Sequence, residues 1–164
     1  MRKPARLGAV SAATVLLSIG LTGTAQADNP VRETFEHSAT VTVSDLCAFP
    51  VTIDISVAGF ALTSIGKSGS SQILHITETD TFSANGNTLV GDPISYQVHI
   101  RFDENGEPTK YLGTGVFARV PLPNGETFFA AGQIDALAAG QGDFLVIPDP
   151  GRSKNLDAFC AALA

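Results

Sequence analysis

The sequence has no tryptophan, only two cysteines and a small share of charged residues, which make up 16% of the chain. Without tryptophan there is no indole ring on which a sugar could stack, so an exposed Phe or Tyr would have to take that role. Ten Lys and Arg stand against 16 Asp and Glu, and the basic residues are scattered along the chain. Because nucleic-acid phosphates are bound by clustered Lys and Arg, nucleic acid is excluded as a partner. An anionic membrane surface is disfavoured for the same reason.

The long apolar run of the sequence lies at the N-terminus. Three basic residues within positions 1–6 precede an apolar stretch over 7–22, and Ala25-Gln26-Ala27 follows as a small-x-small site. This order is typical of a secretory signal peptide and predicts that residues 1–27 are removed before Asp28. A retained membrane anchor is the alternative, but the stretch is shorter than the roughly 20 residues that a span requires. We therefore expect a secreted, extracellular protein with no membrane association after cleavage.

The mature chain, residues 28–164, is expected to form one domain. Of the 164 residues, the first 27 hold three of the ten basic side chains and no acid, which leaves 137 residues with a net charge of −9. A chain of this length buries roughly two-thirds of its unfolded surface in a single core.

Cys47 and Cys160 are the two cysteines. In an oxidising compartment such a pair usually forms a disulfide. A nucleophilic thiol would need a nearby His and a setting that stabilises the thiolate. A metal site would need a second Cys or a His at ligand spacing, which neither cysteine has. We therefore predict a disulfide between Cys47 and Cys160.

The mature chain carries the pattern of β-strands. Apolar and polar residues alternate over 35–43 and 51–57, which predicts half-buried strands. Asn-Gly pairs at 85–86, 105–106 and 124–125 predict tight hairpins, because both residues tolerate positive φ. Further strands are predicted at 73–84, 88–91, 94–102, 109–120, 127–135 and 144–147.

Other segments are expected to be irregular or helical. Residues 28–33 read as a loose start, and residues 59–71, rich in Gly and Ser, as a loop or a weak edge segment. Asn155 is expected to cap a closing helix over 156–163, and no earlier stretch of the mature chain is long and apolar at helical spacing. The predicted fold class is all-β: an antiparallel meander of about eight strands that forms a barrel or a sandwich, with a short C-terminal helical turn.

The alternation also predicts which side chains face the interior. The apolar positions over 51–57 and 96–102 are expected to share one largely filled interior, while the polar positions between them face water. His75 and His99 lie on the polar side of their strands. His37 falls on the apolar side beside Phe35, so it is the histidine expected inside. Phe35, His37 and Tyr96 are the candidate pocket residues.

The layout of the chain resembles a set of small secreted actinobacterial proteins of unknown function. The resemblance covers most of the mature chain and is carried by Cys47-Ala48-Phe49-Pro50-Val51, the Gly-rich segment, residues 124–128 and the late Cys160. These motifs are structural, and no activity is attached to the set, so no catalytic residue is carried over. The resemblance implies a secreted β-domain and supports the disulfide.

Motifs for catalysis or cofactor binding are missing from the sequence. Residues 66–68 lack the preceding Gly of a phosphate-binding loop, and no Gly-x-Ser-x-Gly elbow occurs. Residues 103–107 carry oxygens suited to a loose calcium site, but a solvated hairpin tip explains the same residues. We therefore predict no catalytic residue, no cofactor and no metal ligand.

The sequence favours a secreted, disulfide-stapled β-domain that acts as a non-catalytic binding or interaction module. Its partner would be a protein or an apolar small molecule, and its oligomeric state is not fixed by the sequence. The alternative is a barrel enzyme of isomerase or cyclase type acting on an apolar small molecule, which needs only positioned polar groups in a Phe-lined lumen. A structural envelope protein is a third reading. A cavity holding a His or a carboxylate would favour the enzyme, and a filled core would favour the binding module.

We expect the mature protein to begin at Asp28, because Ala25 and Ala27 supply the small residues that signal peptidase requires. N-terminal sequencing of the secreted protein measures this directly. A start more than a few residues away, or a full-length chain retained by the cells, would contradict the expectation.

Overall fold

The protein is all-β, and its strands form one antiparallel sheet. The computed structural model describes residues 29–67, 69–137 and 153–164. The hydrogen-bonding order is β1-β2-β3-β5-β6-β7-β8, and β4 pairs with the end of β3. The elements are β1 (Val31–Val43), β2 (Val51–Gly66), β3 (Gly69–Ala84), β4 (Asn87–Val90), β5 (Ile94–Phe102), β6 (Pro108–Pro121), β7 (Thr127–Asp135), β8 (Ser153–Lys154) and α1 (Leu156–Leu163).

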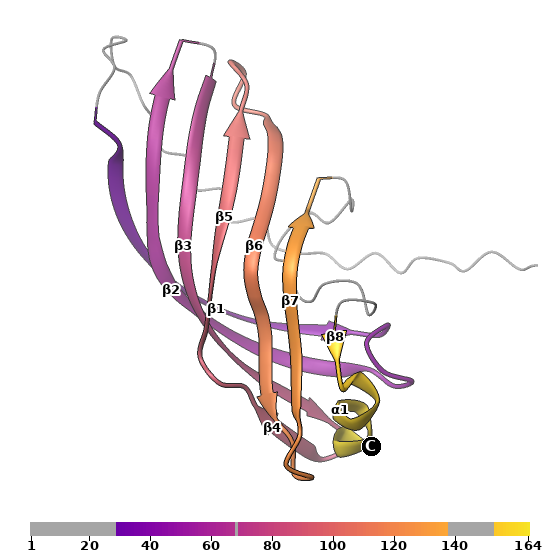
Figure 1. Cartoon of the computed structure of the whole chain (residues 1–164). Helices are drawn as coiled ribbons and strands as arrows, with labels where there is room; N and C mark the ends of the chain where they lie inside the picture. The colour runs from indigo at the N-terminus through magenta and orange to yellow at the C-terminus, as the bar shows by residue number, and fades with distance from the viewer. Residues whose placement is uncertain (1–28, 68, 138–152) are drawn as a thin grey trace, which may run out of the picture.

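The sheet is strongly curled, as Figure 1 shows. Strands β1 and β2 bend until the loop between them, residues 44–50, lies near α1 and β8. The hydrogen-bonding path is nevertheless open: within the described residues β1 pairs only with β2, and β8 only with β7. The structure therefore confirms the antiparallel meander and the closing helix, with the curled sheet wrapped around one interior.

Most predicted strands are confirmed, and two loop predictions are wrong. The segment 59–71 continues β2 and β3 almost to their common turn, and β1 begins at Val31. Thr63 shows the reason, since it is paired with Val31 on one side and Gln72 on the other. Pairing to a neighbour on each side outweighs the weak strand preference of a Gly- and Ser-rich segment. The strand predicted at 144–147 lies outside the described residues.

The Asn-Gly pairs form turns as predicted. Asn85 and Gly86, with φ of 51° and 86°, make the two-residue turn between β3 and β4. The other two pairs lie in longer loops, where Gly106 and Gly125 have φ of 83° and 85°. In each of these loops the residue after Gly closes the hairpin with its carbonyl, at Glu107 and Glu126. Glycine is needed at these positions because positive φ strains residues with a Cβ.

The core lies on the concave, inner face of the sheet, in its lower part in Figure 1. The interior predicted from alternation over 51–57 and 96–102 is confirmed for its buried members, whereas Ile100 and Phe102 are only half-buried, and of these two Ile100 packs against the core. The largest fully buried side chains come from β2, β3, β5, β6, β7 and α1, and are Phe82, Phe117, Phe128, Phe159, Ile53, Leu163, Val51, Val98 and Val120.

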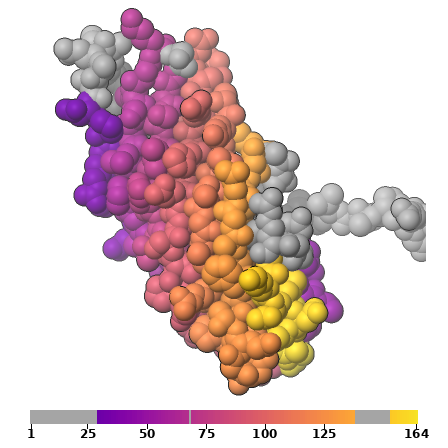
Figure 2. Space-filling model, viewed as in Figure 1, coloured from indigo at the N-terminus to yellow at the C-terminus, as the bar shows by residue number. Residues whose placement is uncertain are grey.

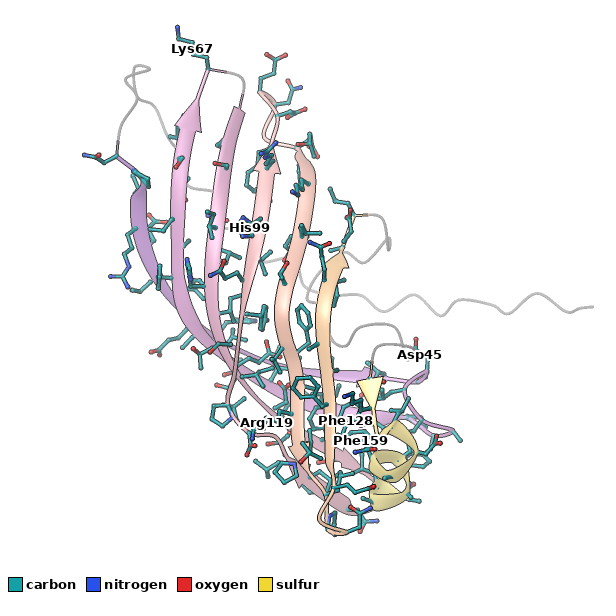
Figure 3. The ribbon with its side chains drawn as sticks, viewed as in Figure 1. Asp45, Lys67, His99, Arg119, Phe128 and Phe159 are labelled. Atoms are coloured by element: carbon teal, nitrogen blue, oxygen red, sulfur yellow. A yellow bond between two sulfur atoms is a disulfide. The ribbon has the colours of Figure 1, made fainter. Side chains whose placement is uncertain are left out.

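Helix α1 covers the lower end of this core. The Phe159 ring lies edge-on to Phe82 at 5.2 Å between centroids and against Phe128 at 4.5 Å. Figure 3 labels Phe128 and Phe159 side by side at this end of the molecule. An eight-residue helix is too short to be stable alone in water, so the docking of Phe159 helps to keep it folded.

Polar and covalent links hold α1 in place. The predicted disulfide is present: the Cα atoms of Cys47 and Cys160 lie 5.6 Å apart and 113 positions apart in sequence. The Asn85 side-chain amide donates to the main-chain oxygen of Leu163 at 3.0 Å. Asn155 precedes the helix as predicted but does not cap it with its side chain, which donates instead to the Thr127 carbonyl at 2.9 Å. The helix is thus bound to the β1–β2 loop, the β3–β4 turn and β7.

We expect Cys160→Ser to lower the free energy of unfolding by roughly 4–5 kcal/mol, because the unfolded chain regains the entropy of a large loop. Denaturant unfolding of the mature protein measures the change. Ala161→Ser, on the exposed side of the same helix, is the matched control and should change stability by less than about 0.5 kcal/mol. A loss for Cys160→Ser no larger than that of the control would contradict the expectation.

Candidate functional site

Above the core, the sheet also presents an outer face, which we define as the face opposite the core. On β3, Ile76 and Phe82 are buried in the core, so His75 and Thr77 project from the outer face. The same alternation places Phe60 of β2 and Gln97 of β5 beside His75, because the three residues are cross-strand partners. The outer face of this region therefore gathers polar and aromatic side chains from adjacent strands.

Four side chains on this face form a row across β1, β2, β3 and β5. They are Arg32, Phe60, His75 and Gln97. The rings of Phe60 and His75 stack at 4.5 Å between centroids with 15° between their planes. The Arg32 guanidinium lies 4.2 Å from the centre of the Phe60 ring. On the other side, the Gln97 amide nitrogen lies 3.4 Å from Nδ1 of His75. Because each member contacts the next, the row is held in one arrangement before any ligand arrives.

A shallow groove of about 570 Å³ lies beside this row. Ile76 and Tyr96, whose side chains point into the core, contribute to its floor. Apart from Tyr96, whose hydroxyl points into the core, its described lining residues carry two imidazoles, an amide and three hydroxyl groups, and none of them is an Asp or Glu. The polar lining residues are His75, Thr77, Ser95, Gln97, His99 and Thr114.

Two cations lie opposite each other next to the groove, in a chain whose net charge is −6. Arg101 follows His99 on the outer face of β5 and is paired with Lys110 of β6, and both cations are exposed. Residues that are scattered in the sequence are thus neighbours in the sheet. Acids share this face at Glu36 of β1, Asp54 of β2 and Asp135 of β7. The β5–β6 hairpin tip next to Arg101 and Lys110 carries three more, Asp103, Glu104 and Glu107.

Of the three predicted pocket residues, Tyr96 contributes to the groove floor, whereas Phe35 and His37 do not line the groove. Tyr96 is buried in the core, and Phe35 is half-buried over Gly59 in the same cross-strand row of the inner face. His37 keeps the predicted register, since it pairs with the buried Val57, but its side chain is exposed. The expected burial of His37 is therefore wrong. The reason is that β1 is an edge strand among the described residues, so its inner face is covered less than that of the central strands.

Among the described residues, the core also holds two buried acids that the sequence prediction missed. Glu78 and Asp80 project from β3 between Ile76 and Phe82, and they are only 7% and 6% exposed. The Tyr96 hydroxyl donates a hydrogen bond of 2.5 Å to a carboxylate oxygen of Glu78. Among the described residues, Oδ1 of Asp80 has no hydrogen-bond partner. The core thus contains a buried polar cluster of Glu78, Asp80 and Tyr96.

Burial is the main cause of the raised pKa values in this cluster. Desolvation raises the pKa of Asp80 to about 8, and the adjacent Glu78 charge adds to the shift. Desolvation also raises the pKa of Glu78, against hydrogen bonds from Tyr96 and Asp80 that lower it. Burial and the Glu78 charge raise the pKa of Tyr96, which keeps the phenol protonated. These shifts favour an arrangement in which Asp80 holds the proton of the pair and Glu78 accepts hydrogen bonds from Asp80 and from Tyr96.

The sequence did contain a signal for these acids. Threonine occupies every second position from Thr77 to Thr81. Glu78 and Asp80 therefore lie on the same face of the strand as the apolar Ile76 and Phe82. The signal was overlooked because acidic residues are rarely buried. What the alternation could not reveal is the Tyr96 hydroxyl, which comes from β5 and is brought to Glu78 only by the strand pairing.

Other sequence candidates resolve into structural roles. The Asp103 carboxylate accepts hydrogen bonds from the main-chain N–H groups of Asn105 and Glu107 at 2.8 and 2.9 Å, which lowers its pKa. Its oxygens therefore shape the hairpin tip. No group of three or more potential metal ligands occurs within the described part of the chain. That part also contains no helix long and apolar enough to cross a membrane.

Comparison with known proteins gives no assignment. No family model matches the chain, and no curated protein or solved structure matches it either. Any function must therefore be argued from the groove and the buried cluster themselves.

We expect the free energy of unfolding to fall as the pH rises from about 4 to about 8. In this range the folded protein keeps the Asp80 proton that the unfolded chain, with a pKa near 3.8, has already released. Asp80→Asn keeps a neutral side chain at every pH, and should remove most of this decline. Denaturant unfolding across the pH range measures both proteins.

Asp45→Asn, in the exposed β1–β2 loop, is the matched control and should leave the pH dependence unchanged. Equal pH dependence in the wild type and in Asp80→Asn would contradict the assignment of the proton to Asp80.

Proposed function

We propose that the protein is a secreted, non-catalytic binding module whose ligand site is the groove on the outer face. The observation that carries this proposal is the groove itself, which lies on the face opposite a core filled by aromatic side chains. A ligand that binds there does not have to enter the packed interior.

The size and rigidity of the groove support this role. Its volume of about 570 Å³ falls within the range common for ligand sites, roughly 300–1,000 Å³. The stacked pair Phe60 and His75 belongs to a row that is fixed by its own contacts. A site whose side chains are already ordered loses less conformational entropy when a ligand binds.

Secretion is part of the proposal. The signal-peptide pattern of residues 1–27 supports export, and a disulfide between distant cysteines is typical of an oxidising compartment. We also propose that the chain belongs with the small secreted actinobacterial proteins that it resembles in layout.

The second candidate is an acid–base enzyme, and the observation in its favour is the buried cluster of Glu78, Asp80 and Tyr96. A neutral carboxylic acid beside a carboxylate can pass a proton at neutral pH. However, both acids are more than nine-tenths buried, and neither lines the groove. A substrate would have to enter the packed core to reach them, so we favour the binding module.

We expect small organic fragments that bind the mature protein to perturb the amide NMR signals of Gln97, His99 and Thr114. Thr114→Trp should fill the groove and abolish these perturbations. Thr42→Trp is the matched control, because Thr42 is also exposed on the outer face but lies near the other end of β1. Perturbations that converge on Glu78 and Asp80 would favour the enzyme, and perturbations away from the groove would contradict the binding site.

A further inference from the structure

Two imidazoles line the same groove from adjacent strands. His75 belongs to β3 and His99 to β5, far from each other in the sequence. His75 pairs with Gln97, and His99 lies two positions further along β5 on the same face, so the two histidines are diagonal cross-strand neighbours. Diagonal neighbours on one face of a sheet lie roughly 7–8 Å apart, which long side chains can bridge. Both rings are therefore within reach of one small ligand.

His75 is held in one orientation by its neighbours. Its ring stacks on Phe60 with 4.5 Å between centroids, and its Nδ1 lies 3.4 Å from the Gln97 side-chain amide. A histidine that binds a metal through one ring nitrogen usually hydrogen-bonds through the other, which fixes the tautomer and the direction of the ring. The Gln97 amide can make this hydrogen bond, because it offers both a donor and an acceptor. Nε2 of His75 then remains as the coordinating atom.

His99 stands between apolar side chains. It pairs with Ile73 of β3 on one side and with Leu112 of β6 on the other, and both are half-buried on the outer face. Neither of these neighbours has a polar side chain that could occupy the ring nitrogens. Figure 3 labels His99 in the upper part of the sheet, away from the aromatic core at Phe128 and Phe159.

The groove is open to solvent. Figure 2 shows the upper part of the molecule as a broad surface built by β2, β3, β5 and β6. A shallow groove in such a sheet encloses only a small part of an organic ligand, whereas an ion held by two side chains needs no enclosure. The shape of the groove therefore suits a coordinated ion.

The donor atoms of the groove select the class of ion. Its described lining residues include two imidazoles, and none of them is an Asp or Glu. Ca²⁺ and Mg²⁺ are bound through oxygen, mainly from carboxylates, so the groove does not suit them. Imidazole nitrogen suits Zn²⁺, Cu²⁺ and Ni²⁺. The pair of histidines therefore fits a late transition-metal ion.

Charges of both signs surround the groove on the outer face. The cations are Arg32, Arg101 and Lys110, and the acids are Glu36, Asp54 and Asp135. The β5–β6 tip adds three more acids beside Arg101 and Lys110. Neither sign dominates the field at the histidines, so the binding of an ion depends on the coordinate bonds from their nitrogens.

We propose that the groove binds a divalent late transition-metal ion through Nε2 of His75 and a ring nitrogen of His99. Zn²⁺ takes four ligands in a tetrahedral arrangement, with Zn–N distances of about 2.0–2.1 Å. The two imidazoles fill two of these positions, and water or donor atoms of a ligand in the groove fill the others. This inference rests on the proposed function and names the ligand class of the same groove.

The test titrates the mature protein with Zn²⁺ and follows the imidazole signals of its three histidines by NMR. We expect saturable binding of a single ion, with shifts at His75 and His99 and none at His37. Ca²⁺ is the control ion and should shift none of them, because it prefers oxygen ligands.

Replacement of single histidines by Phe locates the ligands. His75→Phe keeps a ring that can stack on Phe60 but removes both nitrogens, and His99→Phe does the same between its apolar neighbours. Each should weaken Zn²⁺ binding by about tenfold or more, because one of two coordinate bonds is lost. His37→Phe is the matched control: its exposed imidazole does not line the groove, and the effect should stay within about twofold. A thermal melt of each variant verifies the fold.

The absence of saturable shifts at His75 and His99, or an equal loss in His37→Phe, would overturn the metal proposal. If organic fragments still perturb the groove in that case, the binding module survives and only its ligand class is wrong. If neither Zn²⁺ nor fragments perturb the groove, both proposals fail.

Discussion

The link between the β1–β2 loop and helix α1 is the constraint on which the rest of the structure depends. The sheet curls but its hydrogen bonds do not close among the described strands, so its two ends are joined by other means. Cys47 and Cys160 supply a covalent joint, and Phe159 inserts between the rings of Phe82 and Phe128. If this joint is lost, the lower end of the core is exposed to water, because an eight-residue helix does not hold its place unaided.

The buried acids show that the core is not optimised for stability alone. Two carboxyl groups on adjacent inward positions of β3 cost free energy, because desolvation penalises each charge and like charges repel. The cost is limited when the pair keeps one proton and places its single charge on Glu78, where Tyr96 donates to it. Oδ1 of Asp80 still lacks a partner among the described residues, so this part of the penalty is not recovered.

The sequence predicted the elements whose signals are local. Alternation located β1 and β2, Asn85 and Gly86 located a hairpin, and the helix was found with its bounds. Prediction from the sequence failed where the pairing of distant strands decides whether a residue is ordered or buried. The Gly- and Ser-rich tip of the β2–β3 hairpin is ordered by its neighbours, and His37 is exposed because β1 is an edge among the described strands. The groove was equally hidden, since Phe60, His75 and Gln97 belong to three strands and meet only through their register.

The inner and outer faces are linked through Tyr96. Its hydroxyl is bonded to Glu78 on the inner side, while the same residue contributes to the floor of the groove on the outer side. Its cross-strand neighbour Gly115 reinforces this position, because a Cβ there would lie 2.7 Å from the Cβ of Tyr96 and force the strands apart. The distance between β5 and β6 at the groove is therefore set from within the core. A ligand on the outer face meets a floor that the interior has already fixed, which reduces the entropy lost on binding.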